Sequence, residues 1–188
     1  HVVLANPPFS GRVDRDRIVE DVKVGTTTAT ELLFLKYMLD SLRPGGRCSV
    51  IVPEGVLFGS TGAHKELRRQ LIENNRVEAV LSLPGGVFQP YSGVKTSVLF
   101  FRKGGSTGHV QFLHADDDGY KLDANHDTPI EADDLPALIE AFATRDAARA
   151  RWEARDPAAE WSQKWWFADA ATLRANDFNL SGSRYRPM

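Results

Sequence analysis

The chain has 188 residues, of which 42 % are hydrophobic and 26 % charged, enough for one globular domain with a real core. No apolar run approaches the roughly 20 residues that span a bilayer, and no secretory leader opens the chain. The single cysteine, Cys48, cannot form an internal disulfide. These features predict a cytoplasmic protein without a membrane contact. The net charge of -2 lacks the basic surplus that is usual in a protein that holds DNA alone.

The first predicted element is a buried strand over Val2 to Ala5, and a stiff polar turn, Asn6-Pro7-Pro8-Phe9, follows it directly. The two prolines fix their own φ angles and restrict the residues before them, so the Asn6 amide and the Pro7 carbonyl are held in one arrangement. Their oxygens can accept hydrogens from a planar amine, while Phe9 offers a face on which a flat ring can stack. A strand that merely ends in a proline-rich turn is the alternative reading of these four residues.

A polar segment from Ser10 to Thr30 follows, and its length and charge are typical of a lid or binding loop beside a site. Thr28 and Glu31 have the spacing of a capping box, and Glu31 to Leu42 is apolar on nearly all sides, which predicts a well-buried helix.

The middle of the chain alternates strand and helix patterns, which indicates an α/β sheet. The short link between the third and fourth predicted strands holds no helix, so these two strands should be antiparallel. The predicted elements are a strand over Cys48 to Val52, a helix over Ala63 to Glu73, and strands over Val77 to Leu83, Thr96 to Arg102 and His109 to His114, the last at an edge.

Beyond His114, Asp116-Asp117-Asp118-Gly119 is predicted as a turn, and it lacks the alternating ligands and distal Glu of a calcium loop. The five histidines show no zinc-ligand spacing with Cys48, so no metal site is predicted. A helix should begin near Asp133 or Asp134, with Pro136 in its first turn, and continue over Ala147 to Arg155.

Two helices carry basic clusters, and the C-terminal part carries an aromatic cluster. Each basic cluster is either a DNA-binding patch or, the favoured interpretation, a solvated helix face. The aromatic cluster suits base stacking or, the favoured interpretation, core or subunit packing. The residues are Lys65, Arg68 and Arg69; Arg145, Arg149, Arg151 and Arg155; and Trp152, Trp161, Trp165, Trp166 and Phe167.

The Asn-Pro-Pro-Phe motif resembles the catalytic motif of the adenine-N6 DNA methylases, and the stretches after it are similar to the modification subunit of type I restriction-modification systems. The stretches are Thr-Glu-Leu-Leu-Phe-Leu (30 to 35), Leu-Arg-Pro-Gly-Gly-Arg (42 to 47), Val-Pro-Glu-Gly-Val-Leu-Phe-Gly (52 to 59), Leu-Pro-Gly-Gly-Val-Phe (83 to 88), Gly-Val-Lys-Thr-Ser-Val-Leu-Phe-Phe (93 to 101), Phe178-Asn179-Leu180-Ser181 and Ser183-Arg184-Tyr185.

The resemblance implies an S-adenosylmethionine-dependent methyltransferase sheet of the Rossmann-like type, of which this chain is the second half, with a reversed edge strand and a helical C-terminal extension. The chain is accordingly divided into the second half of the catalytic domain (1–103), an edge strand and loop (104–130), and the helical extension (131–188). The family binds its methyl donor mainly through a glycine-rich loop upstream of this motif. No such loop follows a strand here, and the glycines from Gly104 to Gly108 are predicted as a hairpin turn.

The implied activity is methyl transfer from S-adenosylmethionine to N6 of adenine in double-stranded DNA, by a truncated chain that is inactive alone. Asn6, Pro7, Pro8 and Phe9 would be catalytic, with Asn6 and Pro7 also touching the cofactor. The implied partners are a specificity subunit and, depending on other chains, a restriction subunit. The alternatives are a methyltransferase acting on glutamine amides or RNA bases, and a non-catalytic interaction scaffold or gene remnant.

Overall fold

The computed structural model describes residues 1–8, 14–20, 23–24, 29–89, 91–154 and 164–187. Phe9, Thr28, Arg155 and Trp161 lie outside these residues, as does most of the polar segment 10–30, so the predictions made for them stay predictions. The strands are β1 (Val2–Ala5), β2 (Arg47–Pro53), β3 (Arg76–Ser82), β4 (Thr96–Arg102), β5 (His109–His114), β6 (Asp118–Tyr120), β7 (Pro129–Asp133) and β8 (Trp165–Asp169). The helices are α1 (Thr30–Ser41), α2 (Glu54–Phe58), α3 (Gly62–Asn74), α4 (Leu135–Ala143), α5 (Arg145–Glu153) and α6 (Ala170–Ala175), with short 3-10 turns at Arg15–Arg17 and Gly182–Tyr185.

Six strands form one mixed sheet in the order β1-β2-β4-β3-β5-β8. β1 is parallel to β2, and β3 is parallel to β5, whereas β4 runs antiparallel to both β2 and β3. The predicted antiparallel pairing of β3 with β4 is therefore confirmed. β4 nevertheless lies inside the sheet, because it inserts between β2 and β3 rather than extending the sheet beyond β3.

The outer edge on the C-terminal side belongs to β8, which is antiparallel to β5. The prediction that His109 to His114 forms an edge strand is therefore wrong in position, because β8 covers its outer side. The segment 131–188, expected to be helical, holds α4, α5 and α6 but also contributes β7 and β8. The Trp165–Asp169 segment is a strand because it pairs with the distant strand β5, and the local sequence of this apolar segment does not reveal that partner.

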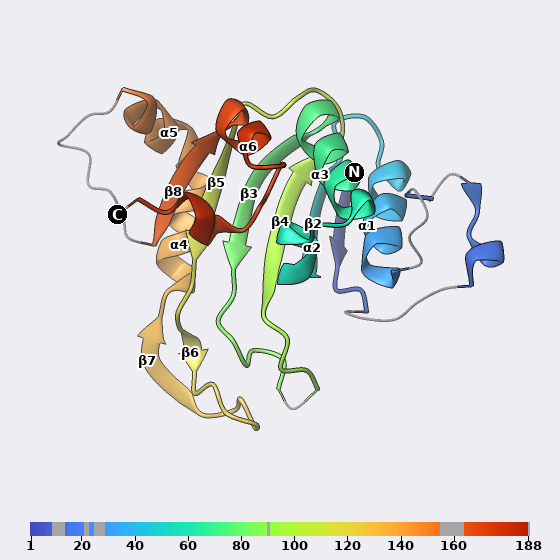
Figure 1. The fold of residues 1–188 in the computed structure, drawn as a ribbon. Coiled ribbons are helices and arrows are strands. Elements are labelled where there is room, and N and C mark those ends of the chain that lie inside the picture. Colours follow the sequence, from blue (N-terminus) through green and yellow to red (C-terminus); the bar gives the residue numbers. More distant parts are fainter. Residues whose placement is uncertain (9–13, 21–22, 25–28, 90, 155–163, 188) are drawn as a thin grey trace.

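One face of the sheet carries the main core, which α1, α2, α3 and α6 cover (Figure 1). Val50, Leu99 and Val80 on adjacent strands are at most 2 % exposed and pack there with Leu67 of α3. Burial of such side chains contributes about 1.5 to 3 kcal/mol each. This shared core fixes the relative positions of the strand ends.

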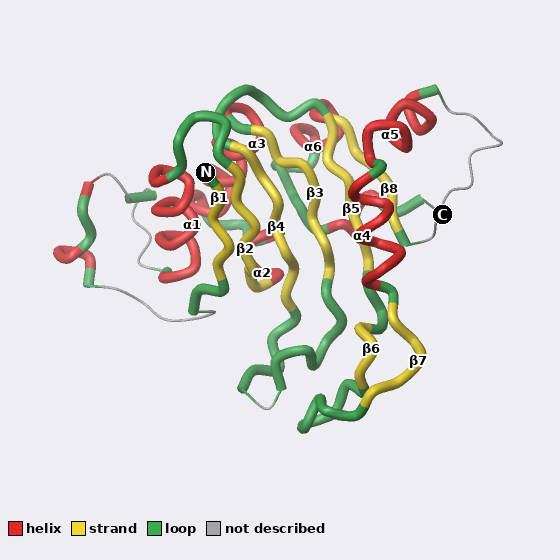
Figure 2. The backbone as a smooth tube through the Cα atoms, turned by 180° about the vertical axis from the view of Figure 1, so that it is seen from behind, coloured by secondary structure: helices red, strands yellow, loops and turns green. Residues whose placement is uncertain are grey.

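The other face is covered only in part. α4 lies over this face, as the view from behind in Figure 2 shows. Its side chains Leu138 and Phe142 pack with residues of β3, β4 and β5. Val2 and Leu4 of β1 point to this same face and are 51 % and 79 % exposed. The prediction of β1 as a buried strand is therefore correct only for its other side, where Val3 and Ala5 meet the main core.

A two-stranded sheet of β6 and β7 projects from the end of β5 (Figure 1). The second half of the predicted turn Asp116 to Gly119 belongs to a strand, because Asp118 is the first residue of β6 and pairs with Asp133 of β7. We call residues 116–134 the acidic hairpin, because they contain eight Asp or Glu and one Lys.

Candidate functional site

Six strand ends meet at one edge of the main sheet, which we call the carboxyl edge. The pairing directions bring the carboxyl ends of β1, β2, β3 and β5 together with the amino ends of β4 and β8. Open α/β sheets bind ligands at the carboxyl ends of their strands. Polar side chains at this edge are therefore the first candidates for a site.

The predicted motif lies at this edge, directly after the last residue of β1, where Ala5 pairs with Val50 of β2. Asn6 and Pro8 are exposed, and Pro7 is half-buried. The described residues make no hydrogen bond to the Asn6 side chain, so its amide is available to a ligand. Phe9 lies outside the described residues, and its stacking role stays a prediction.

An ion pair joins the neighbouring strand ends. Glu54 begins α2 directly after β2, and Lys95 precedes β4; Lys95 Nζ lies 3.5 Å from Glu54 Oε1. The Glu54 backbone N–H also donates to the Lys95 carbonyl at 3.1 Å. Both contacts fix the base of the β3–β4 loop beside the end of β2.

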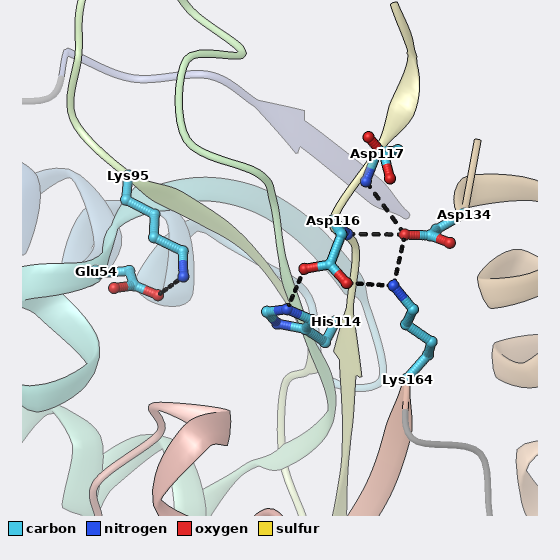
Figure 3. A network of polar contacts seen from close by, with 7 residues as sticks. All are labelled: Glu54, Lys95, His114, Asp116, Asp117, Asp134 and Lys164. Atoms are coloured by element: carbon cyan, nitrogen blue, oxygen red, sulfur yellow. Dashed lines mark hydrogen bonds and ion pairs between the residues drawn. The ribbon is translucent and has the colours of Figure 1, made fainter. Parts of the chain in front are cut away.

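A second polar group lies further along the edge and is a network rather than a pair (Figure 3). His114 Nε2 lies 2.8 Å from Asp116 Oδ1, and Lys164 Nζ donates to both Asp116 and Asp134. Asp134 Oδ2 also accepts the Asp116 and Asp117 backbone N–H groups, at 2.8 and 3.1 Å. The network ties the end of β5 to the starts of α4 and β8.

The charges in this network shift one another. The hydrogen bond from Lys164 lowers the pKa of Asp116, with a further contribution from His114. The same bond to Asp116 raises the pKa of Lys164, and the bond to Asp134 adds to it. Structural ion-pair networks shift pKa values as catalytic ones do, so this network does not by itself define a reaction.

A small cleft of about 80 Å³ opens between these two polar groups. Ser82 and Ser97, which pair across β3 and β4, line it together with His114. Its other wall is the C-terminal segment from Ser181 to Arg186. Ser97 is only 1 % exposed, and its Oγ has no hydrogen-bond partner within the described residues.

The C-terminal segment is held in place by a buried arginine. Arg68 of α3 is 3 % exposed and donates four hydrogen bonds, to the backbone carbonyls of Val56, Gly59, Asp177 and Phe178. Asp177 and Phe178 both have positive φ angles, of 55° and 57°, so this turn is strained and needs such support. Arg68 thereby positions the segment that closes the cleft.

Beyond that turn, the segment packs across the main core. Leu180 is fully buried, and its N–H donates to the Leu57 carbonyl at 2.9 Å. Tyr185 stacks on Phe112, and its hydroxyl donates to the Asn179 carbonyl at 2.6 Å. Burial raises the pKa of Tyr185 to about 12, so the hydroxyl remains a donor at neutral pH.

The basic clusters are not free patches. Arg68 is buried, Arg69 pairs with Glu66 and Glu73, and Lys65 lies 3.6 Å from Asp177. On the second helix pair, Arg145 donates to Glu78 at 3.0 Å and lies over the Phe142 ring. The contacts of Lys65, Arg69 and Arg145 favour a helix face with local ion pairs over a DNA-binding patch, whereas the prediction of a solvated helix face is wrong for Arg68, because that side chain is buried.

The aromatic cluster and the cysteine also serve the core. Trp166 and Phe167 are 2 % and 4 % exposed, and Phe167 lies against both Trp152 and Trp165. Cys48 is buried, and burial raises its pKa to about 12, which makes it unreactive as a thiolate.

The sequence did not single out the polar groups of the cleft. Lys95 and Ser97 lie within the stretch 93–101, whose one sequence signal is its family resemblance, and His114 is the last residue of a predicted strand. The single signal for them was position, since polar residues at strand ends gather at one edge once the strand directions are known. In the described part of the chain, no group of three or more His, Cys, Asp or Glu is placed to hold a metal ion. None of the described helices is long and apolar enough to cross a membrane.

Comparison with known proteins places the chain in a family. A sequence model described as N-6 DNA Methylase matches residues 1–187, and the chain belongs to this family. It is 34 % identical over 161 residues to the methylase subunit of the type I restriction enzyme EcoEI of Escherichia coli, which covers 81 % of this chain and 32 % of that protein. The family resemblance drawn from the motifs is thus confirmed.

Solved structures agree with this assignment. A chain from a type I R-M system, solved for its complex assembly and conformational transition, matches 96 % of this chain with a TM-score of 0.75 and 32 % identity. The methyltransferase subunit of a type I system from Streptococcus thermophilus matches all of this chain with a TM-score of 0.75 at 22 % identity, which shows the shared fold. The predicted methyltransferase fold is confirmed. This chain spans about a third of the length of these relatives, between 32 % and 38 %.

Proposed function

We propose that this chain is the target-base half of an enzyme that transfers a methyl group from S-adenosylmethionine to N6 of adenine in double-stranded DNA. The observation that carries the proposal is the Asn6-Pro7-Pro8 turn at the carboxyl edge, with an exposed Asn6 amide that makes no hydrogen bond to the described residues. Membership in the N-6 DNA methylase family supports it.

The chain's own residues would hold and orient the amine. Asn6 Oδ1 and the Pro7 carbonyl each accept one hydrogen of the adenine N6 amino group, which increases electron density at the nitrogen. The adenine must leave the duplex to reach this turn, and stacking on Phe9 would offset part of the cost of unstacking. The donor, when bound, supplies an activated methyl group, so catalysis by this chain reduces to orientation.

The donor itself would need residues beyond these 188. Asn6 and Pro7 are the predicted contacts here, and no G-x-G loop follows a strand at the carboxyl edge within the described residues. Gly104 and Gly105, both with positive φ, belong to the connection from β4 to β5 at the opposite edge. We therefore propose that this chain alone is inactive, and that activity requires a segment with its own donor pocket.

The charge distribution suits a DNA partner better than the net charge suggests. The acidic hairpin holds eight of the 25 acidic residues and one of the 23 Lys and Arg residues, so the rest of the chain has 22 basic and 17 acidic residues. That leaves +5 outside the hairpin. We propose that DNA approaches the carboxyl edge from the side of β1 and β4, away from the projecting strands β6 and β7, where phosphates are repelled. At the base of the acidic hairpin, Lys164 pairs with Asp116 and Asp134.

The proposal extends to location and partners. The enzyme would act in the cytoplasm with a specificity subunit that selects the DNA sequence, and a restriction subunit would join in the complete system. The EcoEI and Streptococcus thermophilus relatives are named as subunits of such type I systems, which supports this part.

The experiment that tests the substrate class is product identification. A methylase of the length of its relatives that contains this chain is incubated with isotope-labelled S-adenosylmethionine and, in parallel, with genomic DNA, RNA or glutamine-containing peptide. Mass spectrometry should find labelled N6-methyladenine in DNA only. Label confined to RNA or to the peptide would replace this proposal with one of the alternatives, and no label in any arm would favour the scaffold.

A further inference from the structure

The cleft at the carboxyl edge is lined by both polar and apolar residues. The polar ones include Ser82 of β3, Ser97 of β4, the Glu54–Lys95 ion pair and the serines of the Ser181–Arg186 segment, and Val80, Leu113 and Trp166 are apolar parts of the lining. A cleft of about 80 Å³ is large enough for a group of several atoms. Nothing in the proposed handling of the adenine amine uses these residues.

The Ser97 hydroxyl is the unexplained group of this cleft. Its oxygen is inaccessible to solvent and has no partner among the described residues, although Ser97 lines the cleft. A buried hydroxyl without a partner costs about 1 to 3 kcal/mol, so such a group points to a ligand or to bound water. Thr96, the next residue, also has an unpartnered buried hydroxyl, but it points to the opposite face of β4 and does not line the cleft.

The other polar groups around Ser97 include several hydrogen-bond donors. Ser181 Oγ and Ser183 Oγ are 3.2 Å apart and share one hydrogen, so the other is available. Lys95 and Arg186 bring two positive charges to the lining, against the single carboxylate of Glu54. Lys95 carries three hydrogens and directs its Nζ to Glu54 at 3.5 Å, a distance long enough to yield to a stronger anion.

The cleft lies on the same edge of the sheet as the Asn6 turn. Asn6 follows β1, and Ser97 is on β4, which is two strands further across the sheet. At the usual strand spacing this is about 10 Å. A base held at Asn6 would therefore place the sugar-phosphate chain of its own strand within reach of Ser97.

We propose that this cleft is an anion subsite that binds a phosphodiester group of the DNA strand next to the target adenine, with Ser97, Lys95 and Ser183 as donors. This inference rests on the proposed function for the source of the phosphate. The anion chemistry of the cleft stands without it, because a free phosphate offers the same acceptor oxygens.

The chemistry of the cleft is tested on this chain without DNA or methyl donor. Inorganic phosphate is titrated into the wild type, Ser97→Ala and Thr96→Val, and the backbone amide shifts of β4 and of residues 181–186 are followed by NMR. Phosphate should shift these amides in the wild type and in Thr96→Val, while Ser97→Ala should weaken binding about tenfold, the loss of one charge-assisted hydrogen bond. Equal binding by Ser97→Ala and Thr96→Val, or no shift at these amides in the wild type, would overturn the site.

The source of the phosphate is tested in a complete methylase that contains this chain. A duplex with a neutral methylphosphonate at single positions beside the target adenine is compared with the natural duplex, for the wild type and Ser97→Ala. The account predicts one position at which the neutral linkage weakens wild-type binding about tenfold and has no further effect on Ser97→Ala. If, at every position, the losses of binding affinity caused by the neutral linkage and by Ser97→Ala are additive, the assignment of the phosphate to DNA is contradicted.

The two failures remain distinguishable. If the enzyme methylates no adenine but phosphate binding still depends on Ser97, the proposed function fails and the anion site stands. If adenine is methylated normally and neither phosphate nor methylphosphonate is sensitive to Ser97, the subsite fails and the function stands.

Discussion

The two edges of the six-stranded sheet treat their buried polar side chains in opposite ways. At the edge opposite the carboxyl edge, which we call the amino edge, Thr107 accepts the Val77 N–H at 2.9 Å and donates to the Asn75 carbonyl at 2.7 Å. Asn75 in turn accepts the Gly104 N–H and donates to the Gln70 carbonyl. At the carboxyl edge, Thr96 and Ser97 are equally buried, yet neither hydroxyl has a partner in the described part of the chain.

The two edges of the sheet therefore have different roles: buried side chains at the amino edge stabilise the fold, and those at the carboxyl edge are candidates for ligand binding. Satisfied buried groups hold the chain together, and their removal leaves partners unpaired. A buried group without a partner lowers stability, and one that lines a cleft, as Ser97 does, can bind a ligand there. Substitutions at the amino edge and in the supporting core should therefore alter the free energy of unfolding, whereas those at the carboxyl edge should alter binding or catalysis.

The largest stability effect is expected for Arg68, which supports the segment that closes the cleft. Arg68→Met should lower the free energy of unfolding by about 3 kcal/mol, because four backbone carbonyls lose their charged donor. Arg69→Met is the matched control, since Arg69 is a half-exposed neighbour that pairs with Glu66 and Glu73 and should cost at most about 1 kcal/mol. Urea denaturation followed by circular dichroism measures both, and equal losses would contradict the role of Arg68.

A smaller effect on the free energy of unfolding is expected when the same substitution, Thr to Val, is made at each of the two edges. Thr107→Val should cost about 2 kcal/mol, because the Val77 N–H and the Asn75 carbonyl both lose a buried partner. Thr96→Val should change the free energy of unfolding by less than about 0.5 kcal/mol or raise it, since no partner is lost. Urea denaturation measures both variants, and equal losses in the free energy of unfolding would contradict the proposed difference between the two edges.

The smallest stability effect is expected from the network at the end of β5. The pKa of Asp116 is lowered in the folded chain, so its contribution is present above its ordinary pKa of 3.8 and is lost as the pH falls through the lower folded value. The pKa of Lys164 is raised, so its contribution is complete below 10.5 and is lost as the pH rises through the higher folded value. Asp116→Asn should remove the stability difference between pH 7 and pH 3 that belongs to this bond, measured as the difference in Tm. An unchanged pH dependence of Tm in this variant would assign acid sensitivity to other carboxylates.

Local patterns predicted the strands of the sheet well. The bounds of β1, β4 and β5 agree with the predictions, and those of β2 and β3 differ by one residue at each end, because apolar runs rich in β-branched residues leave few alternatives. The helix predicted from Glu31 begins one residue earlier, at Thr30, and Ala29 at its N-cap makes no side-chain capping bond.

Nonlocal contacts were not predictable in this way. The internal place of β4 and the pairing of β8 with β5 depend on which distant strands meet, and a local pattern does not record this. The β6–β7 hairpin was missed because every residue of β7 is exposed, so it shows no apolar alternation. Arg68 looked like a surface residue on a polar helix, since its burial depends on a segment 109 residues further along the chain.

The candidate site was predictable only as far as its motif. Asn6, Pro7 and Pro8 were chosen from their residue types and their position after a strand, and the structure places them at the carboxyl edge. Lys95, Ser97 and His114 were not chosen, because their proximity arises from three different strand ends. A cleft made by sheet topology has no sequence motif of its own.

The most direct test of the central claim is methyl transfer by Asn6→Ala, in a methylase that contains this chain together with a donor-binding segment. Incorporation of labelled methyl groups into DNA should fall by about 10²-fold or more, the usual result of removing a hydrogen-bonding group that orients the reacting centre. The Tm should not change, because the exposed Asn6 side chain has no bond to lose within the described residues. Asn125→Ala, which alters an exposed asparagine of the acidic hairpin, should transfer methyl groups at the wild-type rate. Wild-type turnover by Asn6→Ala would contradict the account.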